Sequence, residues 1–223
     1  MSRSLKYDIS GRDWRVDLSA LREKGWRSAF APVLADPDRL VVDVGFGRGE
    51  FLLALAAAEP DTAFLGVEYS FKRVLKMARR LALTSLVNVR LVDARAENVV
   101  DEALAEGHVE TFWMNFPDPW PKKRHHRRRL LQPDFVRSAA LRLQPDGVLN
   151  VATDHPGYAE AIDATLSAEP LLANVYAPER FRRDVPGRTP TAYQRVWAAE
   201  GRRFHFFCYR RIARGNGGLT DAG

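Results

Sequence analysis

The chain has 223 residues, which suits one large domain or a domain with a modest appendage, and its hydrophobic fraction of 46% is ordinary for a globular protein. Its single cysteine, Cys208, excludes an intramolecular disulfide, a cysteine-rich metal site and paired-thiol redox chemistry. The formal net charge is +6, no apolar run reaches the roughly 18 residues of a membrane span, and the N-terminus lacks a secretory signal, so we expect a cytoplasmic protein without membrane or metal partners.

Residues 1–38 show no clear periodicity, and we expect them to form an arm or short helices that lie against the domain. From residue 39 to residue 213, apolar runs typical of buried strands alternate with helical stretches, whereas residues 214–223 predict a disordered tail. The expected strands are 39–45, 62–68, 88–94, 109–116, 147–154, 171–176 and 202–211, and the expected helices are 50–60, 71–86, 132–147 and 156–169.

Strands that alternate with helices of this length are typical of a parallel sheet in a doubly wound fold. We therefore expect an α/β, Rossmann-like domain over residues 39–213, with a seven-stranded, mostly parallel sheet and helices on both faces. The last two strands have no expected helix between them, which suggests an antiparallel hairpin or insertion at the sheet edge. The connection 180–195 is rich in Pro, Gly and Arg and is longer than most structureless loops, which indicates a functional segment.

A glycine-rich turn follows the first expected strand and has the sequence Asp43-Val44-Gly45-Phe46-Gly47-Arg48-Gly49-Glu50. Such glycines allow positive φ angles and let a ligand approach the backbone closely. The dinucleotide fingerprint needs its third small residue one position later, where this chain has Glu50. Asp43 and Glu50 would also repel a pyrophosphate but attract a cationic sulfonium ligand. The turn therefore favours S-adenosylmethionine over NAD.

Two further acids lie at the ends of the second and third expected strands. Glu68 stands where an acidic side chain hydrogen-bonds ribose hydroxyls, and Asp93 could accept a hydrogen bond from the adenine amino group. Together with Asp43 they lie at the carboxyl ends of strands, the edge where open α/β sheets bind ligands. These residues predict a Rossmann-like, class I S-adenosylmethionine-dependent methyltransferase.

The positive charge is concentrated just after the fourth strand. Of the 34 Lys and Arg residues, six lie in residues 122–129, and the remaining 28 balance the 28 acidic residues. Such a run favours a polyanionic partner, so we expect Arg127, Arg128 and Arg129 to contact RNA phosphates. Immediately before it, two prolines restrict the backbone on either side of Asp118. Trp120 offers a flat face for a base or serves as a core anchor.

The chain resembles the bacterial tRNA (guanine-N7-)-methyltransferase family, which modifies guanosine 46 in the variable loop of tRNA. The motifs that carry this resemblance lie between about residues 40 and 210. They are the glycine turn, Gly66-Val67-Glu68, Asp93-Ala94, Asn115-Phe116-Pro117-Asp118-Pro119-Trp120-Pro121-Lys122-Lys123-Arg124-His125, Ala152-Thr153-Asp154 and Thr191-Ala192-Tyr193. Among them, the Phe-Pro-Asp-Pro-Trp element is highly specific.

The resemblance implies which residues bind each ligand. Its expected cofactor contacts are Asp43, Glu68, Asp93 and Asp118, and its expected substrate contacts are Lys122, Asp154, Thr191, Ala192, Tyr193 and Gln194. Two positions depart from the family pattern, because Asp43 replaces the usual Glu and Gln194 replaces an acid.

Guanine N7 has a free lone pair and no proton, so methyl transfer to it needs neither a strong base nor a covalent intermediate. The enzyme must place N7 in line with the methyl group. A carboxylate near the N1–H and N2 edge would stabilise the charge that develops on guanine. We assign this catalytic role, as a hypothesis, to Asp118 in preference to Asp154.

Three other functions remain open at this point. A methyltransferase for an exocyclic amine of an RNA base would use a loop similar to Asn115-x-Pro117-Asp118-Pro119-Trp120, since that group carries Asn-Pro-Pro-Tyr. An RNA-binding protein could keep the fold without catalysis, although the intact glycines and acids argue against it. A dehydrogenase is disfavoured by Asp43 and Glu50. The sequence does not separate a monomer from a homodimer.

Overall fold

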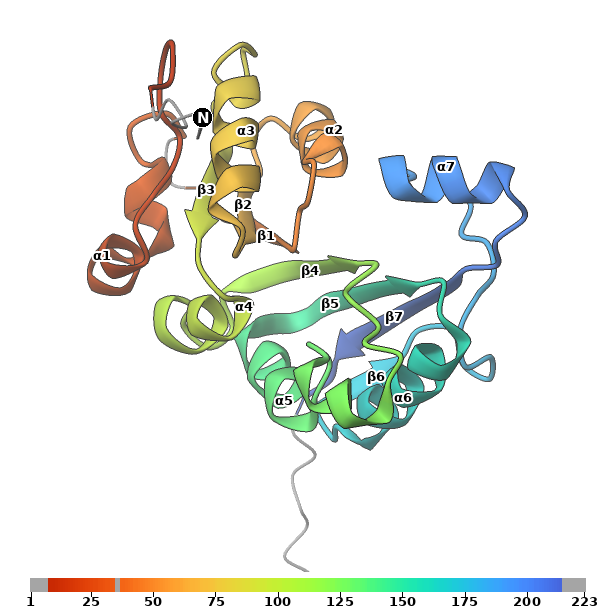
Figure 1. Ribbon diagram of the computed structural model, residues 1–223. Coiled ribbons are helices and arrows are strands. Elements are labelled where there is room, and N and C mark those ends of the chain that lie inside the picture. Colours follow the sequence, from red (N-terminus) through yellow and green to blue (C-terminus); the bar gives the residue numbers. More distant parts are fainter. Residues whose placement is uncertain (1–7, 35–36, 214–223) are drawn as a thin grey trace, which may run out of the picture.

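The computed structural model describes residues 8–34 and 37–213, so the expected tail 214–223 lies outside the described residues. A seven-stranded sheet in the order β3-β2-β1-β4-β5-β7-β6 forms the centre of the molecule (Figure 1). Strands β1 to β5 pair in parallel, and β7 pairs antiparallel with both β5 and β6. The strands are β1 (Leu40–Val44), β2 (Ala63–Glu68), β3 (Val89–Asp93), β4 (Val109–Asn115), β5 (Leu143–Thr153), β6 (Leu172–Asn174) and β7 (His205–Arg211).

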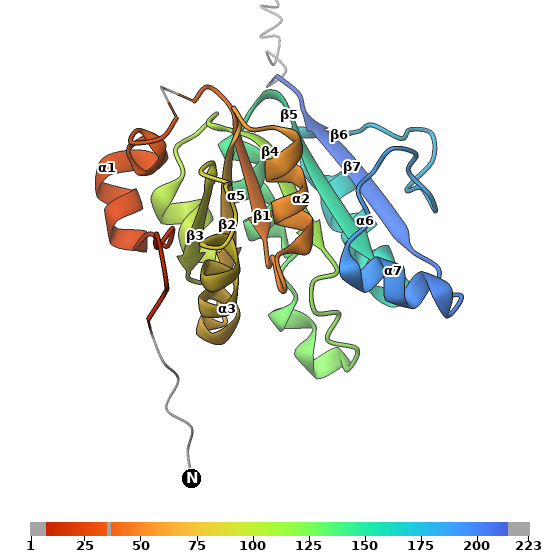
Figure 2. The ribbon, with the colours of Figure 1, turned by 90° about the horizontal axis from the view of Figure 1, so that it is seen from above.

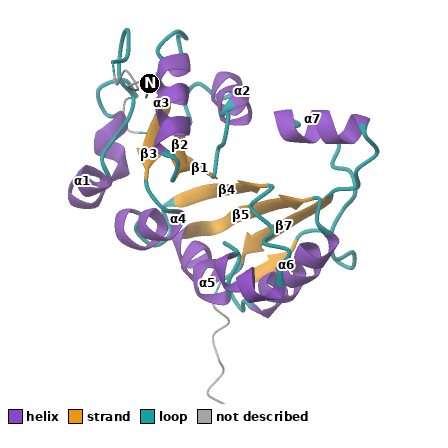
Figure 3. Ribbon diagram, in the orientation of Figure 1, coloured by secondary structure: helices purple, strands orange, loops and turns teal. Residues whose placement is uncertain are grey.

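Helices cover both faces of this sheet. The main ones are α2 (Glu50–Ala58) and α3 (Phe71–Leu81) on one face, and α5 (Pro133–Arg142) and α6 (Pro156–Ala168) on the other (Figure 3). The shorter elements are α4 (Ala96–Asn98), the π-helical turn η1 (Val99–Ala103), the 3-10 helix η2 (Lys123–Arg128) and α7 (Ala192–Ala199). The predicted Rossmann-like fold is thus confirmed, including the antiparallel edge. None of the helices in the described residues is long and apolar enough to cross a membrane.

The N-terminal segment packs against the β3 side of the domain. Its helix α1 (Leu18–Phe30) buries Leu21, Trp26 and Phe30 in the main hydrophobic core. Just before α1, the Val16 N–H donates to the Leu91 carbonyl over 2.9 Å, so a short bridge covers the edge of β3. This cover matters because an open strand edge invites pairing with other chains.

Two elements end or begin where the sequence did not predict them. The helix expected over residues 132–147 ends at Arg142, because Leu143 takes an extended conformation (φ −62°, ψ 138°). Strand β5 begins at Leu143 and contains Asp146, whose φ of 63° is left-handed. A Cβ on Gly147 would lie 3.0 Å from the Val109 carbonyl, so glycine lets β5 approach β4 there.

A helix also lies between β6 and β7, where none was expected. Thr191 starts α7 by accepting a hydrogen bond at Oγ1 from the Gln194 N–H over 3.0 Å. The helix has only eight residues and buries none of them, and the Pro, Gly and Arg residues before it are typical of a loop.

Candidate active site

The glycine turn after β1 combines left-handed backbone with open space. Gly45, Gly47 and Gly49 have φ angles of 72°, 58° and 78°, which other residues adopt at a cost. A Cβ on Gly49 would lie 2.2 Å from Met77 Sδ, whereas a Cβ on Gly45 would meet no atom within 4 Å. The turn is therefore packed tightly against α3 on one side and is open to a ligand on the other.

Glu68 joins the glycine turn to the end of β2. Its buried carboxylate accepts hydrogen bonds from the Gly47 N–H (3.2 Å) and the Ser70 N–H (3.0 Å) and pairs with Arg73 (3.3 Å). The register of β2 and β3 places it beside Asp93, whose pKa is raised by partial burial and by Glu68, although Arg15 opposes the shift. The two acids expected to read ribose and adenine thus lie side by side at one edge.

Asp43 is the last residue but one of β1 and is only 2% exposed. Burial raises the pKa of its carboxyl to about 7, and Glu68 adds to this rise, while the nearby Arg188 guanidinium lowers it. Asp43 makes no hydrogen bond through its side chain with residues 8–34 or 37–213. Its carboxylate therefore has an opposite charge nearby but no bonded donor.

The segment after β4 has strained backbone at both ends of its Pro-Asp-Pro core. Phe116 and Trp120 have φ angles of 55° and 42°, which are unusual for large side chains. Arg129 holds the segment from inside: it is 6% exposed, and its Nε donates to the Pro119 carbonyl over 2.8 Å. The structure thus places Arg129 within the fold and not on the surface where we expected a phosphate contact.

A pocket of about 270 Å³ brings together polar side chains of three separate segments. Asp118 lines it from the loop after β4, Asp154 from the end of β5 and Tyr193 from α7. The Tyr193 hydroxyl donates to Asp154 over 2.9 Å, and Arg202 donates to the same carboxylate. Figure 2 shows α7 and the segment after β4 beyond the same ends of the strands.

The other expected substrate residues are distributed around this pocket. Lys122, Arg127 and Arg128 are exposed on η2 and just before it, and Arg128 lies 5.0 Å above the Trp120 ring. Thr191 is buried as the cap of α7, while the neighbouring Ala192 is half-buried. Gln194 faces away toward Arg188, from which its side-chain oxygen accepts a hydrogen bond over 2.8 Å.

Sequence reasoning missed three residues at this edge. Arg188 contacts both Gln194 and Asn115, Arg202 holds Asp154, and Tyr69 is 68% exposed directly after Glu68. The Arg-rich composition of residues 180–195 was the available signal for Arg188, but composition does not reveal which arginine turns inward.

The strand order and the glycine turn with acids at strand ends define a Rossmann-like methyltransferase. Solved structures share this fold: the 16S rRNA methyltransferase KamB is 17% identical, with a TM-score of 0.62 over 83% of this chain and 94% of that chain. A structure described as an antibiotic-related methyltransferase is also 17% identical, with a TM-score of 0.58 over 84% of this chain and 94% of its own. At this identity the likeness concerns the fold alone.

Closer relatives identify the family. A family model described as "Putative methyltransferase" matches residues 37–207. The tRNA (guanine-N(7)-)-methyltransferase of Leifsonia xyli subsp. xyli is 40% identical over 86% of this chain and 89% of the relative. The enzyme of the same name from Geobacter metallireducens is 32% identical over 83% and 88%, and that from Thermotoga maritima is 37% identical over 79% and 55%. The chain belongs to the tRNA (guanine-N(7)-)-methyltransferase family.

Proposed function

We propose that this protein transfers a methyl group from S-adenosylmethionine to N7 of a guanosine in tRNA, at position 46 of the variable loop. The observation that carries the proposal is the pocket that joins Asp118, Asp154 and Tyr193 at the edge where the glycine turn opens. The relative that is 40% identical bears the name of this activity. Because tRNA is the substrate, we place the reaction in the cytoplasm.

The residues present fit the cofactor. When bound, S-adenosylmethionine supplies an electrophilic methyl group on a sulfonium. Glu68 and Asp93 would hold the ribose and the adenine amino group, and Asp43 would face the cationic methionine part. The open side of Gly45 leaves room for a ligand against the backbone, which supports the same arrangement.

Asp118 is better suited than Asp154 to read the guanine. Its carboxylate is exposed in the pocket and makes no hydrogen bond or ion pair with the described part of the chain. Asp154, by contrast, already accepts from Tyr193 and Arg202. Asp118 would therefore accept from the N1–H and N2 edge and stabilise the positive charge that develops on guanine. Asp154 would orient Tyr193 at the pocket wall.

The exposed cations next to the pocket suit the tRNA backbone. Lys122, Arg127 and Arg128 project from the segment that also holds Asp118, so phosphate contacts there would deliver the base to the pocket. Arg129 contributes differently, because its hydrogen bond to Pro119 stabilises the Asp118 loop.

The relatives argue against a methyltransferase for an exocyclic amine. Those from Leifsonia xyli subsp. xyli and Geobacter metallireducens, which this chain covers almost in full, are both named for guanine N7.

The direct test is incubation with labelled S-adenosylmethionine and unmodified tRNA, followed by nucleoside analysis. We expect the label in 7-methylguanosine alone. Label in a nucleoside methylated on an exocyclic amine, or no transfer from a protein that binds both ligands, would contradict the proposal.

A further inference from the structure

Arg188 is a largely buried cation whose hydrogen-bond partners are all neutral. It donates to Asn115 Oδ1, to Gln194 Oε1 over 2.8 Å and to the Thr189 carbonyl over 3.4 Å. No acidic side chain in residues 8–34 or 37–213 forms an ion pair with it. Its positive charge is therefore not neutralised by direct contact.

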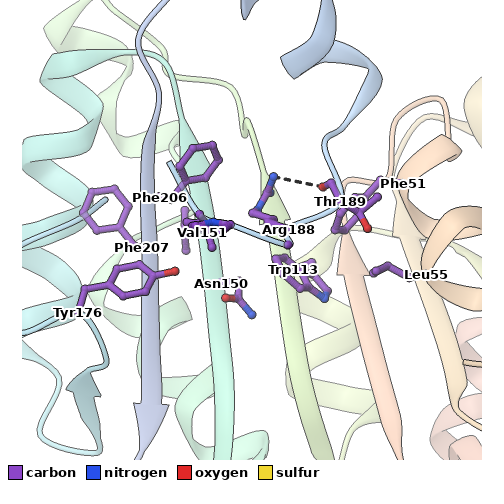
Figure 4. Close-up of a pocket in the computed structure, with 13 residues that line it drawn as sticks. Phe51, Leu55, Trp113, Asn150, Val151, Tyr176, Arg188, Thr189, Phe206 and Phe207 are labelled. Atoms are coloured by element: carbon purple, nitrogen blue, oxygen red, sulfur yellow. Dashed lines mark hydrogen bonds between the residues drawn. The ribbon is translucent and has the colours of Figure 1, made fainter. Parts of the chain in front are cut away.

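Aromatic rings surround this guanidinium. Its central carbon lies 4.7 Å from the Phe206 ring, 5.4 Å from Trp113 and 5.6 Å from Phe51, and it lines a pocket of about 300 Å³ (Figure 4). Burial lowers the pKa of Arg188 to about 10. A cation removed from water in this way is costly unless an anion completes its surroundings.

The nearest anion of the protein does not fill this role. Asp43 lies close enough for the two charges to influence each other, but no hydrogen bond joins them. A buried acid and a buried base that face each other without contact suit a ligand that carries both charges. The α-amino acid group of a methionine is such a ligand, since it holds an ammonium next to a carboxylate.

We propose that Arg188 binds the carboxylate of the methionine part of S-adenosylmethionine, while Asp43 faces its ammonium group. The inference rests on the proposed function, because it assumes this cofactor. Asn115 supplies a second donor: its Nδ2 is buried without a hydrogen-bond partner in the described residues, and Arg188 fixes the amide orientation. Guanidinium and amide donors together match the two oxygens of a carboxylate.

A tRNA phosphate fits this position less well. Phe51 is the second residue of α2, so the guanidinium lies behind the first turn of the helix that follows the glycine turn. A terminal carboxylate can enter between these rings, whereas a phosphodiester brings a sugar on each side.

This assignment explains why a neutral amide at position 194 suits the proposed role of Arg188. The family pattern has an acid there, and an acid bonded to Arg188 would neutralise the guanidinium. Gln194 keeps the hydrogen bond over 2.8 Å without adding charge, so Arg188 stays available to a ligand carboxylate. Gln194→Glu should therefore weaken cofactor binding, although it preserves size and shape.

The test compares two ligands by calorimetry: S-adenosylhomocysteine and its decarboxylated analogue, which keeps the amine. We expect the unmodified protein to prefer the carboxylate by about tenfold or more, as for hydrogen bonds to charged groups. Arg188→Ala and Gln194→Glu should each reduce this preference to near unity, and Arg188→Lys should give a value between those of Arg188→Ala and the unmodified protein. Arg195→Ala is the matched control, because Arg195 is exposed and contacts the Pro190 carbonyl.

Each outcome has a distinct meaning. A preference that survives in a folded Arg188→Ala protein and in Gln194→Glu overturns the assignment, and so does a loss of tRNA affinity with unchanged ligand preference. Gln194→Glu keeps the test decisive if Arg188→Ala fails to fold. Failure of the proposed function looks different, since the unmodified protein would then bind neither adenosyl ligand or produce no 7-methylguanosine.

Discussion

The cofactor half and the substrate half of this site are built in different ways. In the cofactor half, Asp43, Glu68 and Asp93 each lie at the carboxyl end of a buried parallel strand, and the strand register alone brings the last two together. In the substrate half, Asp118, Asp154 and Tyr193 come from a strained loop, a strand end and a helix without buried residues. Tyr193 and Arg202 donate hydrogen bonds to Asp154, and the hydrogen bond from Arg129 to the Pro119 carbonyl holds the loop that carries Asp118.

The two halves should therefore respond differently to substitutions. The cofactor half depends on backbone conformation, so changes at its glycines should alter stability and cofactor binding together. The substrate half depends on individual side chains, so single substitutions there should reduce turnover and leave the fold intact.

The largest effect is expected at Asp118. Replacing Asp118 by Asn removes the carboxylate charge with little change in shape, and should lower kcat by about 100- to 1000-fold, as for the loss of one charge-stabilising group. The tRNA dissociation constant should stay unchanged. Steady-state kinetics and filter binding give the two values, and Asp134→Asn, at an exposed position on α5, is the control. Unaltered turnover would remove Asp118 from catalysis.

A glycine substitution can disrupt the cofactor half through its backbone. Gly49→Ala combines a φ of 78° with a Cβ placed 2.2 Å from Met77 Sδ. It should reduce the free energy of unfolding by about 2–3 kcal/mol and weaken cofactor binding. Gly107→Ala is the matched control, because Gly107 has a φ of 72° but a Cβ added there would meet no atom within 4 Å. This control should reduce the free energy of unfolding by about 1 kcal/mol. If urea unfolding shows the same loss of unfolding free energy in both variants, the contact with Met77 is unimportant.

The exposed cations should have a smaller effect that depends on salt. Replacing Arg127 and Arg128 by Ala should weaken tRNA binding and reduce the slope of log affinity against log salt by about 1 to 2. The control is the pair Arg22→Ala and Lys24→Ala on α1, which removes the same charge from exposed positions outside the η2 segment. If both pairs change the slope equally, the η2 segment makes no specific contribution.

The last effect concerns pH and Asp43. Its folded-state pKa of about 7 lies above the value of about 4 for an unfolded aspartate, so folding takes up a proton between these values. The free energy of unfolding without cofactor should therefore fall as pH rises from 4 to 7, and Asp43→Asn should reduce that fall. Arg188 and Glu68 are the charged groups that face Asp43. Urea titrations at pH 5 and pH 7.5 measure the free energy of unfolding of the unmodified protein and of Asp43→Asn. An identical pH dependence in the two proteins would contradict the burial argument.

Much of the fold could be predicted because its signals are local. Buried strands such as β1 and β2 consist mostly of apolar residues, and the glycine spacing with an acid at the carboxyl end of each strand located the cofactor edge. The rest depends on contacts between distant residues. Whether Arg129 faces phosphate or the Pro119 carbonyl depends on the Tyr158 ring, which lies 4.7 Å away and comes from α6. The position of Arg188 beside Asp43 likewise depends on how the loop before α7 folds back.

Methyl transfer to guanine N7 is tested most directly with tRNA in which 7-deazaguanosine replaces the guanosine at position 46. This analogue has C–H in place of the N7 lone pair and keeps the exocyclic amine. We predict that this tRNA binds with unchanged affinity and accepts no methyl group. Continued methylation of the substituted nucleoside would contradict the account and assign the reaction to another atom of the base.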